Sequence, residues 1–354
     1  MRTAASDLFG VRYPVVQTGM GWVSGPELTA ATANAGGLGI LAGATMSYAE
    51  LAAAIDRTRE LTSQPFGVNL RSDAPDAGRR ADLLISAQVK VASFALAPRP
   101  DLIARLKEAG VVVVPSVGAR RHAEKVAAWG ADAVIVQGGE GGGHTGPVAT
   151  SILLPQVADA VGIPVLAAGG FFDGRGLAAA LCYGAAGIAM GTRFLLTSDS
   201  RVPDAVKQLY LAASVADTVV TDALDGVPQR LLRTDATRRL EAQGRAARLA
   251  RSARAAADFR RLTGSTWTGL AREGLAMRRT HGRALAQVLL AANTPAMLRA
   301  AMVEGRTDYG VMATGQVAGV IEDLPSCAEL IERIVAQAQA VLGRLAGPER
   351  EEEP

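Results

Sequence analysis

Short apolar runs alternate with longer amphipathic stretches between residues 13 and 212, which is the pattern of repeated βα units around a parallel sheet. The apolar runs predict eight strands, at residues 13–17, 37–41, 66–70, 89–94, 111–115, 132–136, 163–168 and 186–190. The amphipathic stretches predict helices that include residues 26–34, 48–60, 101–109, 119–129, 174–183 and 203–212. Eight strands, each followed by a helix, close a barrel, so we expect an α/β fold, a (β/α)8 TIM barrel.

The βα period breaks after residue 220. Residues 221–283 are rich in Arg and Ala at helical spacing and hold no convincing strand, which predicts an Arg-rich helical insertion after strand 8. A further helix is expected at 285–302, then a glycine-rich loop at 310–319 and a last helix at 326–345, while the polar end at 348–354 is expected to fray. The chain is thus divided into a barrel (1–220), an insertion (221–284) and a C-terminal part (285–354).

Length and composition fit one large core, because the chain has 354 residues and 49% hydrophobic content. No window reaches the roughly 18 consecutive apolar residues of a membrane span, and the first residues lack the apolar stretch of a signal peptide. We therefore expect a cytoplasmic protein without a membrane partner. Cys182 and Cys327 lack the spacing of a zinc site or a redox pair, so we expect free thiols and no metal.

Positive charge is concentrated in one segment. The formal net charge is +3, yet 14 arginines and four acidic residues lie between Gln229 and Arg283, a local net charge of about +10. The segment is interpreted either as a solvated helical face or as a recruitment site for a polyanion such as the phosphates of CoA. Aromatic residues are sparse and no DNA- or RNA-binding motif is present, so nucleic acid is not an expected partner.

In a (β/α)8 barrel the working groups lie on loops at the carboxyl ends of the strands, which gives priority to motifs that directly follow a strand. Gly19 and Met20 follow the first strand, where glycine lets backbone amides approach a flat ligand closely. Asn69 follows the third strand and can both donate and accept hydrogen bonds. These three residues are candidates for ligand contacts.

The sixth predicted strand leads into residues 137–146, which hold six glycines in ten positions. Such a loop, with Gly142 and Gly143 near its centre, can wrap a ligand with its backbone and place His144 against it. Glu140 is a second candidate, either to orient His144 or to act in its place. The alternative interpretation is a flexible surface lid with a solvated histidine.

Glycine turns also follow the last two predicted strands, with Gly169 and Gly170 after the seventh and Gly191 and Thr192 after the eighth. Loops at these two places form the recurrent phosphate site of the fold, in which backbone N–H groups face the dianion. The Thr192 hydroxyl could add one more donor. The alternative is that the glycines only make tight βα turns.

At these positions the chain resembles the nitronate monooxygenase family of FMN barrels, which includes flavin-dependent enoyl-thioester reductases. The shared stretches are PVVQTGMG, NAGGLGIL, FGVN, GADAVIVQGGEGGGHTG, VLAAGGF, GAAGIAMGTRF and TGQVAG. The resemblance implies FMN as cofactor and His144 as the acid/base residue. It also implies flavin contacts by the residues that match the family's motifs: Gly19, Met20, Asn69, Gln137, Gly169, Gly170, Gly191, Thr192 and Gln316.

Longer stretches, among them FFDGRGLAAALCYGAAGIAMGTRFLLTSDS and GQVAGVIEDLPSC, are similar to actinobacterial flavin dehydrogenases that act late in cholesterol and steroid ring breakdown. This similarity implies desaturation of a bicyclic CoA thioester beside its carbonyl. We expect His144 to remove the acidic proton while backbone donors of residues 138–143 stabilise the enolate oxygen.

Three alternatives remain for the function: nitronate oxidation, enoyl-thioester reduction with NAD(P) as electron partner, and a flavin-binding subunit without catalysis. An exposed insertion is typical of an interface, so a homodimer is one expectation for the assembly.

Overall fold

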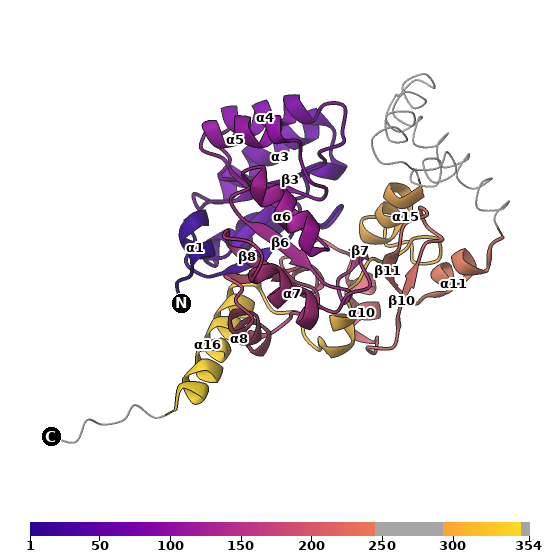
Figure 1. The fold of residues 1–354 in the computed structure, drawn as a ribbon. Coiled ribbons are helices and arrows are strands. Elements are labelled where there is room, and N and C mark those ends of the chain that lie inside the picture. Colours follow the sequence, from indigo (N-terminus) through magenta and orange to yellow (C-terminus); the bar gives the residue numbers. More distant parts are fainter. Residues whose placement is uncertain (245–292, 348–354) are drawn as a thin grey trace.

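The structure, a computed structural model, describes residues 1–244 and 293–347. Eight parallel strands close into a barrel, and each of them lies within or overlaps one predicted strand (Figure 1). The expected TIM barrel is therefore confirmed. In order around the barrel, the strands are β1 (Val15–Gln17), β2 (Leu38–Leu41), β3 (Gly67–Leu70), β4 (Val91–Phe94), β5 (Val112–Val117), β6 (Val134–Gln137), β8 (Val165–Ala168) and β9 (Gly187–Met190).

Helices pack around the barrel because each strand is buried on both faces and its continuous apolar run needs cover outside as well as inside. Local signals set their starts: Ser47 and Glu50 form a capping box before Tyr48–Leu61, and Asp173 caps Gly174–Cys182. The helices between strands are α2 (Pro26–Asn34), α3 (Tyr48–Leu61), α4 (Ala77–Ser86), α5 (Pro100–Glu108), α6 (Arg120–Ala128), α7 (Thr150–Ala158) and α8 (Gly174–Cys182), with a 3₁₀ turn η1 (Gly43–Thr45).

The ring of helices is completed by the C-terminal helix. The four-residue α9 (Thr192–Leu195) follows β9, and α10 (Asp204–Leu211) then packs against the 3₁₀ turn η2 (Gln316–Val320). The 20-residue α16 (Cys327–Ala346) packs instead between α8 and α2, and it lies beside α8 in Figure 1. It buries Leu330, Ile331 and Ile334, so residues far along the chain close the layer that βα succession leaves open.

The two ends of the barrel differ. At the amino-terminal end, α1 (Ala4–Phe9) places Ala5 and Phe9 in the same apolar cluster as the inward side chains of the strands. The Thr3 hydroxyl donates to the Ala186 carbonyl at 2.6 Å and fixes this helix to the start of β9. Because this end is plugged, only the carboxyl ends of the strands are available for a site.

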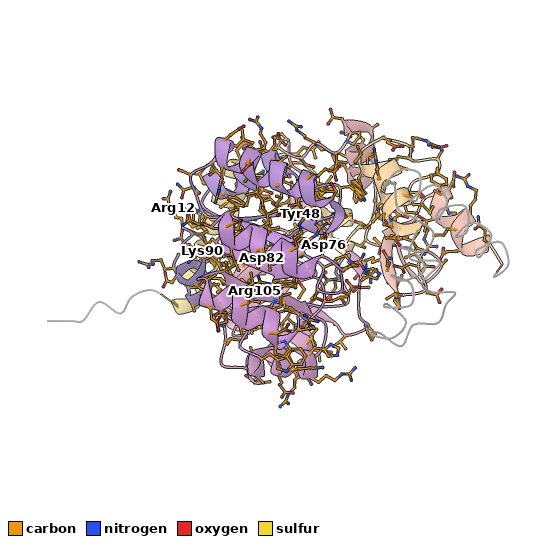
Figure 2. All side chains as sticks on the ribbon, turned by 90° about the horizontal axis from the view of Figure 1, so that it is seen from above. Arg12, Tyr48, Asp76, Asp82, Lys90 and Arg105 are labelled. Atoms are coloured by element: carbon orange, nitrogen blue, oxygen red, sulfur yellow. The ribbon has the colours of Figure 1, made fainter. Side chains whose placement is uncertain are left out.

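The outer face of α3, α4 and α5 carries charged side chains, and Figure 2 shows Tyr48, Asp82 and Arg105 on this face. The Arg105 guanidinium donates to Asp82 across α4 and α5, and the Arg79 guanidinium lies 3.8 Å from the centre of the Tyr48 ring. These contacts lie on the solvent side of the helices and contribute little to the barrel itself.

A second, antiparallel sheet lies at one side of the barrel, with strand order β10 (Thr218–Thr221), β11 (Gln229–Leu232) and β7 (Gly143–His144). The helices α11 (Asp235–Ala242) and α15 (Asn293–Met302) lie near it (Figure 1). The expectation of no strand in residues 221–283 is therefore wrong at the start of that segment. Arg230 interrupts the apolar run of β11, yet the strand forms because it pairs with β10 on one side and the glycine-rich loop on the other.

Several expectations fall on residues outside the described ranges. These are the Arg-rich segment from residue 245 onward, His281, the first part of the helix expected at 285–302, and the polar end at 348–354; the rest of that helix is present as α15. Within residues 1–244 and 293–347, every helix is too short or too polar to cross a lipid bilayer.

Candidate functional site

The loops after β1 and β9 meet the end of β3, which holds Asn69, at the carboxyl end of the barrel. A Cβ placed on Gly19 would lie 2.4 Å from the Asn69 Cβ, so only glycine lets the backbone after β1 pass this side chain. A Cβ on Gly191 would lie 3.3 Å from the Met20 sulfur. Asn69 is buried, and its amide donates to the Ser93 hydroxyl on the neighbouring strand at 3.3 Å. Four predicted ligand contacts, from two loops and from β3 itself, therefore adjoin one another; Asn69 lies within the third strand rather than after it.

The turn after β8 has the backbone geometry expected of a glycine pair. Gly169 and Gly170 have φ of +92° and +88°, a region in which a side chain is strained. A Cβ on Gly169 would approach the Gly138 carbonyl and the Gly141 nitrogen to 3.1 Å each. The turn is thus pressed against the glycine-rich loop, and its residues cannot exchange glycine for a larger residue without a change in shape.

The turn after β9 joins the C-terminal loop. The buried Thr192 hydroxyl accepts a hydrogen bond from the Gly315 nitrogen at 2.9 Å, and the Gln316 nitrogen donates to the Glu140 carbonyl at 3.0 Å. A Cβ on Gly142 would lie 2.7 Å from the Gly315 nitrogen. Residues of β9, the glycine-rich loop and the segment before η2 therefore form one junction, although about 175 residues separate Gly142 from Gln316.

The glycine-rich loop is pinned by its own hydrogen bonds rather than open as a lid. Three of its N–H groups donate to carbonyls of the loop and the neighbouring strand: Gly138 to Ala168 at 3.0 Å, Gly139 to Val148 at 2.6 Å and Gly141 to Gly138 at 3.1 Å. These three groups are therefore engaged within the protein, which narrows the expected enolate donors of residues 138–143 to the other N–H groups of the loop. Among the described residues, the Gly142 N–H makes no hydrogen bond.

Glu140 has a different place from the one expected. Its carboxylate accepts from the Thr150 nitrogen at 3.0 Å and the Thr150 hydroxyl at 2.8 Å, at the start of α7. It does not bond to His144, so the alternative that it orients this histidine is wrong. Gln137 is the last residue of β6, and its side-chain amide donates to the His144 carbonyl at 2.8 Å. This bond joins the start of the glycine-rich loop to His144.

His144 pairs with an acid that the sequence pattern does not single out. Its Nε2 lies 2.8 Å from Oδ2 of Asp225, which belongs to the loop between β10 and β11. The Asp225 side chain is 4% exposed, while that of His144 is 54% exposed. The Asp225 carboxylate is therefore buried in the protein, while more than half of the His144 side chain is exposed. Sequence reasoning missed Asp225 because nothing in the stretch Asp222–Gly226 distinguishes it from an ordinary loop acid.

The electrostatics of the second sheet support an ionised Asp225. Burial by itself raises the pKa of this carboxyl, but hydrogen bonds from His144 and Gln229 and the charge of His144 outweigh burial, and the pKa lies below its usual value. Burial lowers the pKa of Arg230, whose guanidinium donates to the Gly139 carbonyl at 2.9 Å and the Thr218 hydroxyl at 2.8 Å. Both residues hold the glycine-rich loop from the side of β11.

Four arginines of the basic segment lie within the described residues, and one of them is Arg230 of β11. Arg238 pairs with Asp235 at 2.8 Å on α11, and Arg239 donates to the Asp308 carbonyl. Arg233 lies at the end of β11, where its backbone nitrogen donates to the Asp217 carbonyl at 2.8 Å. The two helical arginines thus have protein partners, and the arginines from residue 245 onward lie outside the described ranges.

Comparison with known proteins gives one family. The profile of the nitronate monooxygenase family matches residues 2–87 and 77–337. A protein of Mycobacterium tuberculosis (strain ATCC 25618 / H37Rv), named (3aS,4S,5R,7aS)-5-hydroxy-7a-methyl-1-oxo-octahydro-1H-indene-4-carboxyl-CoA dehydrogenase, is 64% identical over 343 residues, 96% of each chain. The protein of the same name from Rhodococcus jostii (strain RHA1) is 62% identical over 338 residues, again 96% of each chain.

Solved structures share the architecture over nearly the whole length. FabK from Thermotoga maritima has a TM-score of 0.80 and 34% identity, with 98% of this chain and 99% of that chain covered. The nitroalkane oxidase of Streptomyces ansochromogenes has a TM-score of 0.75 and 28% identity, with 97% and 100% covered.

Proposed function

Because the chain belongs to the nitronate monooxygenase family and is an oxidoreductase, we propose that it is an FMN-dependent dehydrogenase that desaturates a bicyclic, steroid-derived CoA thioester. The main support is the junction at the carboxyl end of the barrel, where two glycine turns, the C-terminal loop and the His144 loop come together. Substrate class is supported by the two relatives, which are named as dehydrogenases of an octahydroindene-carboxyl-CoA thioester.

The residues present fit an FMN. Gly169 and Gly170 adopt left-handed backbone angles and have no side chains of their own, as is typical of a phosphate turn. The Thr192 hydroxyl stands across the same junction and has already accepted one hydrogen bond, so its own proton is available to a phosphate oxygen. We propose that these residues and Gly191 hold the phosphate, and that Gly19, Met20, Asn69, Gln137 and Gln316 contact the rest of the cofactor.

A bound FMN supplies an acceptor for the two electrons removed from the substrate. The chain supplies position, exclusion of water and a proton acceptor. Gly142 and Gly143 would bring backbone close to the ligands, since Gly143 has φ of +68° and a Cβ on it would meet nothing within 4 Å. The Gly142 N–H is the donor we assign to the thioester oxygen.

His144 is the residue we assign as general base. An imidazole changes charge between about pH 5 and 8, so it can accept the proton beside a thioester carbonyl under ordinary conditions. Its side chain is more than half exposed, while the Asp225 carboxylate that it contacts is buried. Of the two other histidines, His122 lies on the outer helix α6, and His281 lies outside the described residues.

The test is anaerobic reduction of the FMN-loaded protein, followed by bleaching of the flavin absorbance. A CoA thioester carrying the bicyclic acid is compared with an alkyl nitronate and with NAD(P)H, and fastest bleaching by the thioester is the expected result. His144→Ala should still bind FMN but be reduced about two to four orders of magnitude more slowly, the usual contribution of a general base.

His122→Ala is the matched control, because it removes an imidazole from an outer helix and should leave the rate unchanged. Bleaching only by the nitronate would contradict the substrate class. Reduction of His144→Ala at the wild-type rate would remove this residue from the mechanism.

A further inference from the structure

We propose that Asp225 is the positioning residue of the site: it binds Nε2 of His144, selects one imidazole tautomer and leaves Nδ1 as the atom that accepts the substrate proton. This inference rests on the proposed function, in which His144 is the base. Asp225 follows the apolar Ala223 and Leu224, both fully buried, in the loop between β10 and β11.

The contacts of Asp225 are those of a fixed carboxylate. Oδ2 lies 2.8 Å from Nε2 of His144 and also accepts from the Gln229 amide at 2.7 Å and the Thr294 hydroxyl at 3.3 Å. Oδ1 accepts from the Val227 nitrogen at 3.1 Å. Four donors from the glycine-rich loop, its own loop, β11 and α15 thus hold one carboxylate, which leaves it little freedom to turn away from the imidazole.

The register of the second sheet brings the two residues together. His144 in β7 is paired with Gln229 in β11, and the same Gln229 donates to Asp225. The strand pairing therefore fixes the backbone position of His144 along β11, while the hydrogen bond to Asp225 fixes the orientation of the imidazole ring. Two independent constraints on one histidine are typical of a residue whose orientation matters to function.

The surrounding charges leave Asp225 as the partner of His144. The Glu140 carboxylate is turned to Thr150, and the Arg230 guanidinium is turned to the Gly139 carbonyl and Thr218. Asp222 starts the same loop, where its carbonyl accepts from the Gly226 nitrogen at 2.8 Å. The lowered pKa of Asp225 agrees with a carboxylate that stays ionised while the imidazole gains and loses its proton.

An ionised carboxylate can only accept a hydrogen bond, so Nε2 of a neutral His144 must carry the proton and Nδ1 must carry the lone pair. In the proton transfer, the C–H bond beside the thioester carbonyl breaks, an N–H bond forms at Nδ1, and the electron pair remains on the substrate as its enolate. Asp225 keeps its charge throughout and stabilises the imidazolium that results.

The tautomer can be measured without turnover. The chain has three histidines, so ¹⁵N-histidine labelling of the FMN-loaded protein yields few ring signals, and His144→Ala assigns the one of interest. We expect protonated Nε2 and unprotonated Nδ1 for neutral His144 in the wild type. In Asp225→Asn the amide can donate to Nε2, so the proton should move to Nδ1. Asp235→Asn, at an exposed acid on α11, is the control that should change nothing.

Kinetics then separate positioning from folding. Asp225→Asn should slow anaerobic flavin reduction about 10²-fold, no more than His144→Ala does, and Asp225→Glu should recover part of the rate because it keeps the charge. FMN absorbance and the melting temperature report whether each variant is folded.

The double variant decides the outcome. If Asp225 acts through His144, adding Asp225→Asn to His144→Ala produces no further loss of rate. A second, equal loss in the double variant would overturn the proposal, as would protonated Nδ1 of His144 in the wild-type spectrum. If His144→Ala alone reduced FMN at the wild-type rate, the proposed function would fail instead, whatever tautomer the spectrum shows.

Discussion

Alanine at Gly142 tests the junction between the glycine-rich loop and the C-terminal loop. A Cβ at this position would lie 2.6 Å from the Thr314 carbonyl carbon and 2.7 Å from the Gly315 nitrogen, both backbone atoms of a second segment. Ordinary contact begins near 3.4 Å, so the two backbones must separate by about 0.8 Å, from 3.4 minus 2.6. Overpacking of this kind costs about 1–3 kcal/mol.

The separation would strain the two bonds of the junction, from Gly315 to Thr192 at 2.9 Å and from Gln316 to Glu140 at 3.0 Å. Each is worth roughly 1 kcal/mol, so losing both would weaken FMN binding about 10- to 30-fold if the junction shapes the cofactor site. The assay is titration of the apoprotein with FMN, followed by flavin fluorescence, together with the melting temperature.

Gly110→Ala, away from the site, is the matched control. A Cβ there meets nothing within 4 Å, yet φ is +79°, so the variant adds backbone strain of about 1 kcal/mol without pushing the loops apart. We expect its FMN affinity to stay within about threefold of wild type. Equal affinities for Gly142→Ala and wild type, or equal losses in both variants, would refute the role given to the junction.

Two further predictions concern the supports of the site. Tyr210→Phe leaves the Ala313 carbonyl without the 2.8 Å bond from the buried phenol and should lower stability by about 1–2 kcal/mol in chemical denaturation; an unchanged midpoint would contradict this. Asp323→Asn removes an ion pair to buried Arg193 and should lower the melting temperature at pH 7. Burial raises the pKa of Asp323, but bonds and charges of Arg333 and Arg193 lower it overall, so its contribution is present above the ordinary Asp value and lost as pH falls. The difference from wild type should therefore narrow as the pH falls below about 4, and a difference that does not narrow there would argue against ionic stabilisation.

The barrel was predictable because buried parallel strands form continuous apolar runs. β5 is the clearest case, since its first three residues are valines buried on both faces. The helix that packs between α8 and α2 was less predictable. α10 follows β9 in sequence with helical spacing, but α16, which starts well over 100 residues after β9, packs beside α8 instead. Periodicity reports that a helix exists and which face is apolar, but not which neighbour covers that face.

The candidate site divides in the same way. Glycines such as Gly170 and Gly191 stand directly after apolar runs and could be placed at the strand ends from sequence alone; the structure puts Gly170 beside Glu140 and Gly191 beside Met20. Asp225 could not be found, because its burial depends on Thr294 of α15, 69 residues away, and on the pairing of β7 with β11. A two-residue strand such as β7 has no pattern of its own and forms only by pairing.

The central claim, that two glycine turns bind the phosphate of FMN, is tested most directly by comparing the affinities of FMN and riboflavin for the apoprotein. We predict that FMN binds about 100-fold more tightly, the worth of two charge-assisted hydrogen bonds. Gly170→Ala should remove most of this difference, while Gly110→Ala, with φ of +79° in open space before β5, should preserve it. Equal affinities of the wild type for FMN and riboflavin, or no binding of either, would contradict the claim.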